Sequence, residues 1–157
     1  MKDKKKLSEM HRINARVLVA YTILTVILFF AYILELVKGS RTIEYILVFS
    51  AFDIIPYILF LIAYKKDKES RKTKYIFSIG FSVLYAFVLL TAAVPTTFVY
   101  IFMLYVVIIP YGDIALCFIT GGVAMAANIV SVVIGFTSGD LTKNDLAMVE
   151  IQLIAVL

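Results

Sequence analysis

The sequence predicts an all-α membrane protein, a polytopic bundle of about six transmembrane helices. The chain has 157 residues, of which 62% are hydrophobic, and its mean hydropathy is +0.98. A soluble domain is nearer half apolar. The apolar residues form runs close to the roughly 20 residues that a helix needs to cross a bilayer. Short polar segments separate these runs, and the charged residues gather in them.

The segment KKDKESRKTK at residues 65–74 predicts the orientation of the chain. Six of its ten residues are Lys or Arg, and residues 2–16 carry another six of the chain's fifteen basic residues. Short loops this basic remain on the cytoplasmic side. We therefore expect residues 1–16 to be a cytoplasmic basic tail and residues 17–157 to be a multi-pass domain of the cell membrane. The two basic segments would lie against an anionic leaflet, so the lipid bilayer is the first expected partner.

Turn signals bound each predicted span. The sequence KGSRT follows the first apolar run, and the basic loop follows the second. Pro95 separates the third run from the fourth, because proline cannot continue a helix but suits its first turn. The fourth run is short, and the thirteen residues of the last run are too few to cross a bilayer as a helix. The expected spans are residues 17–37, 43–64, 75–93, 96–110, 114–136 and, incomplete, 145–157.

Two of these spans carry small residues at four-residue spacing, which lets neighbouring helices approach closely in lipid. The simpler interpretation is packing within the chain, because such rows are common in polytopic bundles. Dimerisation through one row is the alternative. The rows are Ser78, Ser82 and Ala86 in the third span, and Gly122 with Ala126, and Ala127 with Ser131 and Gly135, in the fifth.

Asp53 is the most informative single position. It lies eleventh in a span of 22 residues, and an ionisable group near the bilayer centre costs at least roughly 2.5–3.5 kcal/mol unless it is paired, neutral or hydrated. No Lys or Arg lies within any predicted span. Pro56 follows three residues later and removes a helical hydrogen bond. Asp53 therefore predicts either a functional site or an interhelical hydrogen bond.

Depth in the bilayer predicts partners for Asp53. At 1.5 Å per residue, Asp53 lies about 15 Å from the outer end of its span, and Asn128 about 12 Å from the outer end of the fifth. Tyr85 has a similar depth, and Glu35 and Tyr32 lie nearer the outer end of the first span. These residues predict a pocket for a ligand or cation. The alternatives are a protonated Asp53 that bonds to a neighbouring helix, and proton-coupled transport. For Glu35, as for Glu44, the alternative is a salt bridge with the neighbouring Lys38 and Arg41 that closes the turn.

Catalytic patterns are missing from the sequence. It has no phosphate-binding glycine loop, no nucleophile elbow, and a single histidine, His11, in place of a zinc motif. Cys117 is the one cysteine, so no internal disulfide forms. The basic segments are not interleaved with aromatic residues as a nucleic-acid surface would be. We expect no enzyme, no cofactor, no metal and no nucleic-acid partner.

Several short segments, in this order and spacing, resemble the membrane half of multi-spanning methyl-accepting chemotaxis proteins of anaerobic Gram-positive bacteria. The resemblance covers most of residues 16–136. The segments are ELVKGSRTIEY at residues 35–45, YKK at 64–66, YAF at 85–87 and PTTF at 95–98, with Tyr100 after it.

The resemblance implies a signal transducer whose membrane domain passes a stimulus to a cytoplasmic coiled coil. That coiled coil would bind an adaptor and a histidine kinase, and transducers of this family are usually homodimers. The chain departs from the family because nothing in it matches the methylation helices or the kinase-contact tip. Within signalling, the alternative is the anchor of a histidine kinase or a cyclic-dinucleotide enzyme. Outside signalling, it is a small transporter or permease fragment, or a purely structural anchor.

Overall fold

A computed structural model describes residues 8–91, 95–142 and 145–156. Every regular element in these ranges is helical, so the predicted all-α class is confirmed. Residues 1–7 of the predicted tail, residues 92–93 of the third span, Lys143 and Leu157 lie outside the described residues. The elements are α1 (Glu9–Val37), α2 (Ile43–Lys66), α3 (Lys72–Leu90), η1 (Pro95–Val99), α4 (Tyr100–Ile108), η2 (Ile109–Tyr111), α5 (Ile114–Ser138) and α6 (Leu146–Val156).

Four of the helices, α1, α2, α3 and α5, are long and apolar enough to cross a membrane. They have 29, 24, 19 and 25 residues, and 19 residues already cover about 28 Å. The other two predicted spans are shorter apolar helices, around residues 97–111 and 146–155. The protein is therefore a helical membrane protein by composition and length, with four helices of spanning length among the described residues.

Two predicted boundaries differ from the observed ones. The first helix begins at Glu9, inside the predicted tail, because Ser8 caps it and accepts a hydrogen bond from the His11 amide at 3.3 Å. The predicted span at residues 96–110 is helical but not uniformly α-helical, since 3₁₀ turns η1 and η2 flank a nine-residue α4. Pro110 lies in η2, where its missing N–H prevents α4 from continuing.

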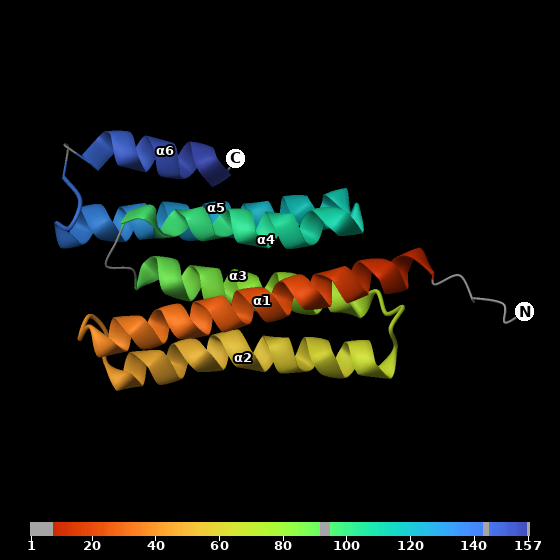
Figure 1. The fold of residues 1–157 in the computed structure, drawn as a ribbon. Helices are drawn as coiled ribbons and strands as arrows, with labels where there is room; N and C mark the ends of the chain where they lie inside the picture. Colours follow the sequence, from red (N-terminus) through yellow and green to blue (C-terminus); the bar gives the residue numbers. More distant parts are fainter. Residues whose placement is uncertain (1–7, 92–94, 143–144, 157) are drawn as a thin grey trace, which may run out of the picture. The chain divides into compact units, whose positions relative to one another are not determined.

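The chain divides into two compact units, residues 1–77 and 78–157, which are described separately. In the first unit, α1 and α2 lie side by side and antiparallel (Figure 1). The turn between them closes with Gly39 in the left-handed region at φ 74° and with a hydrogen bond from the Ser40 amide to the Glu35 carbonyl. Glycine adopts this conformation without the penalty that a Cβ brings.

An aromatic cluster forms the interior of the first unit. The Tyr21 ring contacts three other rings edge to face, with centroid distances of 5.3 Å to Tyr57, 5.6 Å to Phe60 and 4.7 Å to Phe77. Edge-to-face rings attract each other through their quadrupoles in addition to burying area. This cluster joins α1, α2 and the first turns of α3.

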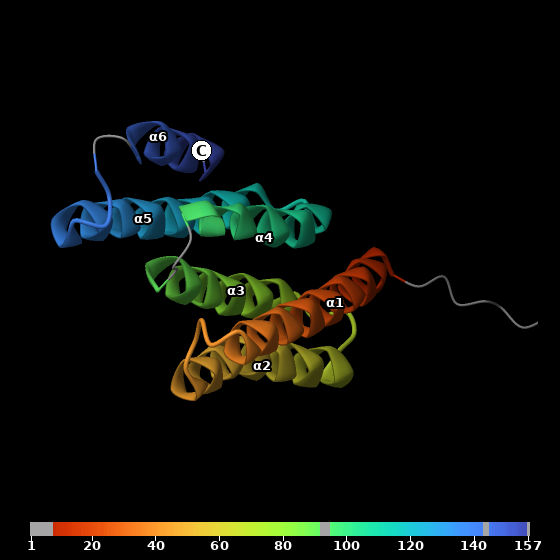
Figure 2. The ribbon, with the colours of Figure 1, turned by 60° about the vertical axis from the view of Figure 1, so that its left-hand side comes forward.

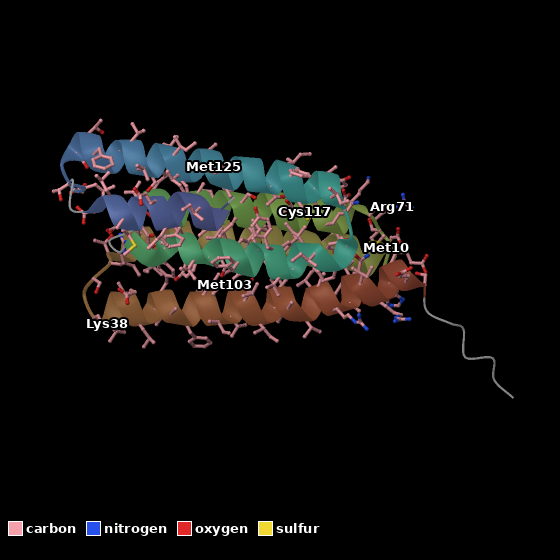
Figure 3. The ribbon with its side chains drawn as sticks, turned by 90° about the horizontal axis from the view of Figure 1, so that it is seen from above. Met10, Lys38, Arg71, Met103, Cys117 and Met125 are labelled. Atoms are coloured by element: carbon pink, nitrogen blue, oxygen red, sulfur yellow. The ribbon has the colours of Figure 1, made fainter. Side chains whose placement is uncertain are left out.

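Asn14 holds the basic loop against α1. Its amide donates to the carbonyls of Lys68 at 2.9 Å and Ser70 at 3.0 Å, and its carbonyl accepts from the Thr73 hydroxyl at 2.9 Å. Asn14 and Thr73 are fully buried. Figure 3 shows Met10 and Arg71 at this end of the unit and Lys38 at the other end of α1.

In the second unit, α5 packs against α4 and α6 (Figure 2). The Asp113 carboxylate caps α5 by accepting a hydrogen bond from the Leu116 amide at 3.0 Å. The hydroxyls of Ser78 on α3 and Thr120 on α5 lie 2.7 Å apart, which links these two helices by a buried hydrogen bond. Asp145 accepts from both the amide and the hydroxyl of Thr142 at 2.8 Å and so orders the turn before α6.

We expect Asn14→Ala to free the basic loop. It removes three hydrogen bonds, each worth about 0.5–1.5 kcal/mol net, so local opening should increase at least about ten-fold. The rate of trypsin cleavage within residues 65–74 of the membrane-reconstituted protein measures this opening. Val19→Ala, at an exposed position of the same helix, is the control. Equal cleavage rates for the two variants would show that Asn14 does not hold the loop.

Candidate functional site

Besides the Asn14–Thr73 and Ser78–Thr120 contacts, polar side chains gather in two clusters, one in each unit, each with a buried Asp or Asn at its centre. A buried polar group is costly unless it is hydrogen-bonded, so each cluster needs an explanation. The first, called here the Asp53 cluster, lies between α1 and α2. The second, the Asn128 cluster, lies between α3, α5 and α6. The Asp53 cluster comprises Asp53, Thr25, Tyr21, Thr22 and Tyr57, and the Asn128 cluster comprises Tyr85, Asn128 and Gln152.

Asp53 is buried on α2, and its side chain is 1% exposed. The hydroxyl of Thr25 on α1 lies near enough to interact with the carboxyl group. The geometry falls short of a hydrogen bond, because neither the Asp53 Oδ2 atom nor the Thr25 Oγ1 atom has a hydrogen-bond partner. The cluster therefore contains two buried oxygen atoms whose hydrogen-bonding capacity is unused.

The remaining members of the Asp53 cluster form hydrogen bonds or pack through aromatic rings. The Thr22 hydroxyl donates to the Leu18 carbonyl at 2.8 Å and lies 3.0 Å from the Tyr57 hydroxyl. The Tyr21 ring packs against Tyr57, and its hydroxyl interacts electrostatically with Asp53. None of these groups is cationic. The carboxyl group of Asp53 consequently lies in a polar but uncharged environment.

Asn128 is the centre of the second cluster and is fully buried on α5. Its amide donates to the Tyr85 hydroxyl on α3 at 2.6 Å and to the Ala124 carbonyl at 2.8 Å. Its carbonyl accepts from the Gln152 amide on α6 at 2.9 Å. One side chain thus joins three helices, with both amide hydrogens and the carbonyl oxygen engaged.

The predicted site residues fall into these clusters unequally. Tyr85 and Asn128 meet directly in the second unit, whereas Asp53 belongs to the first unit and interacts with Thr25. Glu35 forms an ion pair with Lys38 at 3.2 Å near the C-terminal end of α1, and both side chains are substantially exposed. Such exposed pairs contribute little stability. Tyr32 stacks on Phe49 and Tyr45, with centroid distances of 3.8 Å and 5.9 Å.

Some of the small residues in these rows are buried within the chain, and others are exposed. In α5, Ala127 is buried, and a Cβ added at Gly135 would meet Leu141 Cδ1 at 2.6 Å, so this row packs within the chain. Gly122 and Ala126 are exposed, and a Cβ added at Gly122 would meet nothing within 4 Å. In the remaining positions, Ser78 and Ser82 are buried and Ala86 and Ser131 are half-buried.

Two members of the polar clusters, Thr25 and Gln152, were missing from the sequence prediction. Thr25 lies twelve residues before the end of α1 and Asp53 ten residues after the start of α2. In an antiparallel pair these positions have similar depth, so the depth argument applied to α1 would have found Thr25. Gln152 is the one amide side chain in the apolar α6, and a buried amide in an apolar helix seeks a partner.

The described residues hold no group of three His, Cys, Asp or Glu side chains arranged for a metal ion. His11 is half-buried and contacts the Tyr64 ring edge to face, with a centroid distance of 6.2 Å. Cys117 lies half-buried on α5 as a free thiol (Figure 3). Neither residue joins one of the two clusters.

Comparisons with protein-family models, with curated protein sequences and with solved structures find no match. The class that the fold and the clusters define is a helical membrane protein with buried polar contacts between its helices.

We expect Asn128 and Gln152 to be energetically coupled. Interhelical hydrogen bonds in membranes average about 0.6 kcal/mol and reach about 1.7 kcal/mol, so a double-mutant cycle should give a coupling energy in this range. The single variants are Asn128→Ala and Gln152→Ala, and unfolding in mixed micelles measures their stability. The exposed neighbours Ile129 and Ile154, each replaced by Ala, form the control cycle. A coupling energy no larger than that of the control would contradict the Asn128 cluster.

Proposed function

We propose that this chain is the membrane-embedded sensory and anchoring domain of a chemotaxis-type signal transducer. The proposal joins the residue patterns that resemble multi-spanning transducers to the observed four membrane-length helices. Both chain ends would face the cytoplasm, with the N-terminal basic segment and residues 65–74 at the inner leaflet. The adaptor and the histidine kinase would bind to a cytoplasmic region beyond residue 157.

The observation that supports this role best is the way α6 is held. Its buried polar attachment is the hydrogen bond from Gln152 to Asn128, and Asn128 is itself bonded to Tyr85 on α3. In lipid, helices gain no hydrophobic free energy by associating, so small numbers of polar contacts decide between arrangements. A helix held in this way is suited to occupy two positions that differ by little free energy.

The proposed mechanism is a shift or rotation of α6 between two such positions. A stimulus that binds one arrangement better moves the population toward it, by no more than the difference in its affinities. The movement would pass along the chain as a helix displacement, one of the known ways in which switches act. Recognition would occur within the helices or concern the membrane itself, because the longest predicted external loop, residues 137–145, has only nine residues.

A second candidate function, a small transporter, is favoured by Asp53. Ionisable residues inside membrane helices often lie on ion or proton pathways, and Asp53 is buried with an unpartnered oxygen atom. A transporter would carry solute or protons across vesicles that contain the purified protein. A transducer would show no such flux but would change the activity of a bound kinase.

We expect Gln152→Leu to change the basal activity of the kinase in membranes that contain the complete protein, the adaptor and the kinase. Loss of a hydrogen bond worth about 0.6–1.7 kcal/mol moves a two-state equilibrium about three- to twenty-fold. The rate of kinase autophosphorylation is the readout. Ile154→Leu, at an exposed position of α6, is the control and should leave it unchanged. Equal activity of the two variants would contradict signalling through α6.

A further inference from the structure

The hydroxyl of Thr25 differs from the other helical threonines of this protein. A threonine inside a helix commonly donates to the carbonyl four residues earlier. Thr22 and Thr137 do so, at 2.8 and 2.9 Å. Thr73 and Thr120 bond instead to side chains of other helices. Thr25 has no such bond, and its Oγ1 atom has no hydrogen-bond partner although it is buried. Its hydroxyl instead interacts with the carboxyl group of Asp53 on the neighbouring helix.

The surroundings of Asp53 cannot stabilise a bare negative charge. Tyr21 on α1 interacts with Asp53, and the Tyr21 ring packs against Tyr57, one turn after Asp53 on α2. The α3 residue that packs on Tyr21 is Phe77. Residues 17–37 and 43–64 contain no Lys or Arg. A buried ion without a charged partner costs several kcal/mol, which a single hydroxyl does not offset.

The number of unpartnered oxygen atoms near Asp53 indicates which cation could neutralise it. A hard metal cation takes about six or more oxygen ligands, which is far more than the two unpartnered oxygen atoms of this cluster. A proton needs only one donor atom and one acceptor atom. We propose that Asp53 and Thr25 form a proton-binding site, in which the Asp53 carboxylate takes a proton from hydronium, releases water, and donates the new O–H to Thr25 Oγ1.

This step uses both unpartnered atoms. The protonated Asp53 Oδ2 becomes a donor, Thr25 Oγ1 becomes its acceptor, and the new hydrogen bond joins α1 to α2 directly. Loss of the proton leaves a buried carboxylate without a cationic partner, and toward it the Thr25 hydroxyl can act only as a donor. The α1–α2 contact is then weakened as the pH rises. If the chain has the proposed sensory function, this contact makes the proton its stimulus, whereas the binding itself does not depend on that function.

Infrared difference spectroscopy on the full chain in lipid vesicles tests the site, with spectra recorded between about pH 5 and about pH 9, the range over which buried carboxyl groups are known to titrate. We expect a C=O stretch of a protonated, buried carboxyl group that disappears on alkalinisation. The band should be lost in Asp53→Asn, which keeps the side chain's shape. It should change in frequency in Thr25→Val, which removes the acceptor.

Glu35→Gln is the control, because this acid is exposed and paired with Lys38, and it should leave the band unchanged. A band that survives in Asp53→Asn would overturn the proposal, as would a wild-type spectrum without one. So would a band absent at all pH values together with a spectrum that responds to added sodium or potassium, because Asp53 would then hold a metal cation. Since the wild-type spectrum alone can refute the site, the test does not depend on the folding of the variants.

A parallel measurement separates this site from the sensory function. Kinase output of the complete protein should change with pH in the wild type and lose that response in Asp53→Asn. A titrating band without a pH response of the kinase would overturn the proton as the stimulus while the site itself stands. Loss of all kinase coupling, in wild type and variant alike, would instead count against the proposed function.

Discussion

The constraint on which the rest of this structure depends is the need to satisfy polar groups in apolar surroundings. Helices satisfy their own backbones, which is why the described chain is helical throughout. Side chains have to find partners on other helices. Asn14, Asn128 and the Ser78–Thr120 pair do so completely or nearly so. These contacts decide which apolar helix lies against which, because apolar surface alone gives little preference in lipid.

The two polar clusters differ in a way that gives each a different role. Asn128 uses its amide hydrogens and its carbonyl oxygen, and it links α3, α5 and α6 as a structural centre. Asp53 and Thr25 leave one oxygen atom each without a partner. A cluster whose polar atoms are all hydrogen-bonded holds helices in place. A cluster with unpartnered polar atoms can still bind a proton or a ligand. We propose that a proton binds at the Asp53 cluster, and that the Asn128 cluster sets the position of α6.

Much of the fold follows from hydropathy and turn residues alone. The apolar runs predict the long helices within a few residues at most boundaries, because length and hydropathy are sufficient for that. They do not predict the helical start at Glu9, which depends on the cap at Ser8, or the 3₁₀ turns around α4. Depth arithmetic brought Tyr85 and Asn128 together, but Thr25 and Gln152 required knowledge of which faces meet. Exposed Gly122 shows the same limit, since spacing alone does not say which small-residue row is covered.

We propose that these helices serve a cytoplasmic signalling region. The most direct measurement is the coding sequence of the complete protein beyond residue 157. If the chain is a transducer domain, we expect a few more apolar residues, followed by a long heptad-patterned region rich in Ala and Glu that continues from the last helix as a coiled coil. A series of further apolar spans would contradict it and would make Asp53 a residue of a transport pathway.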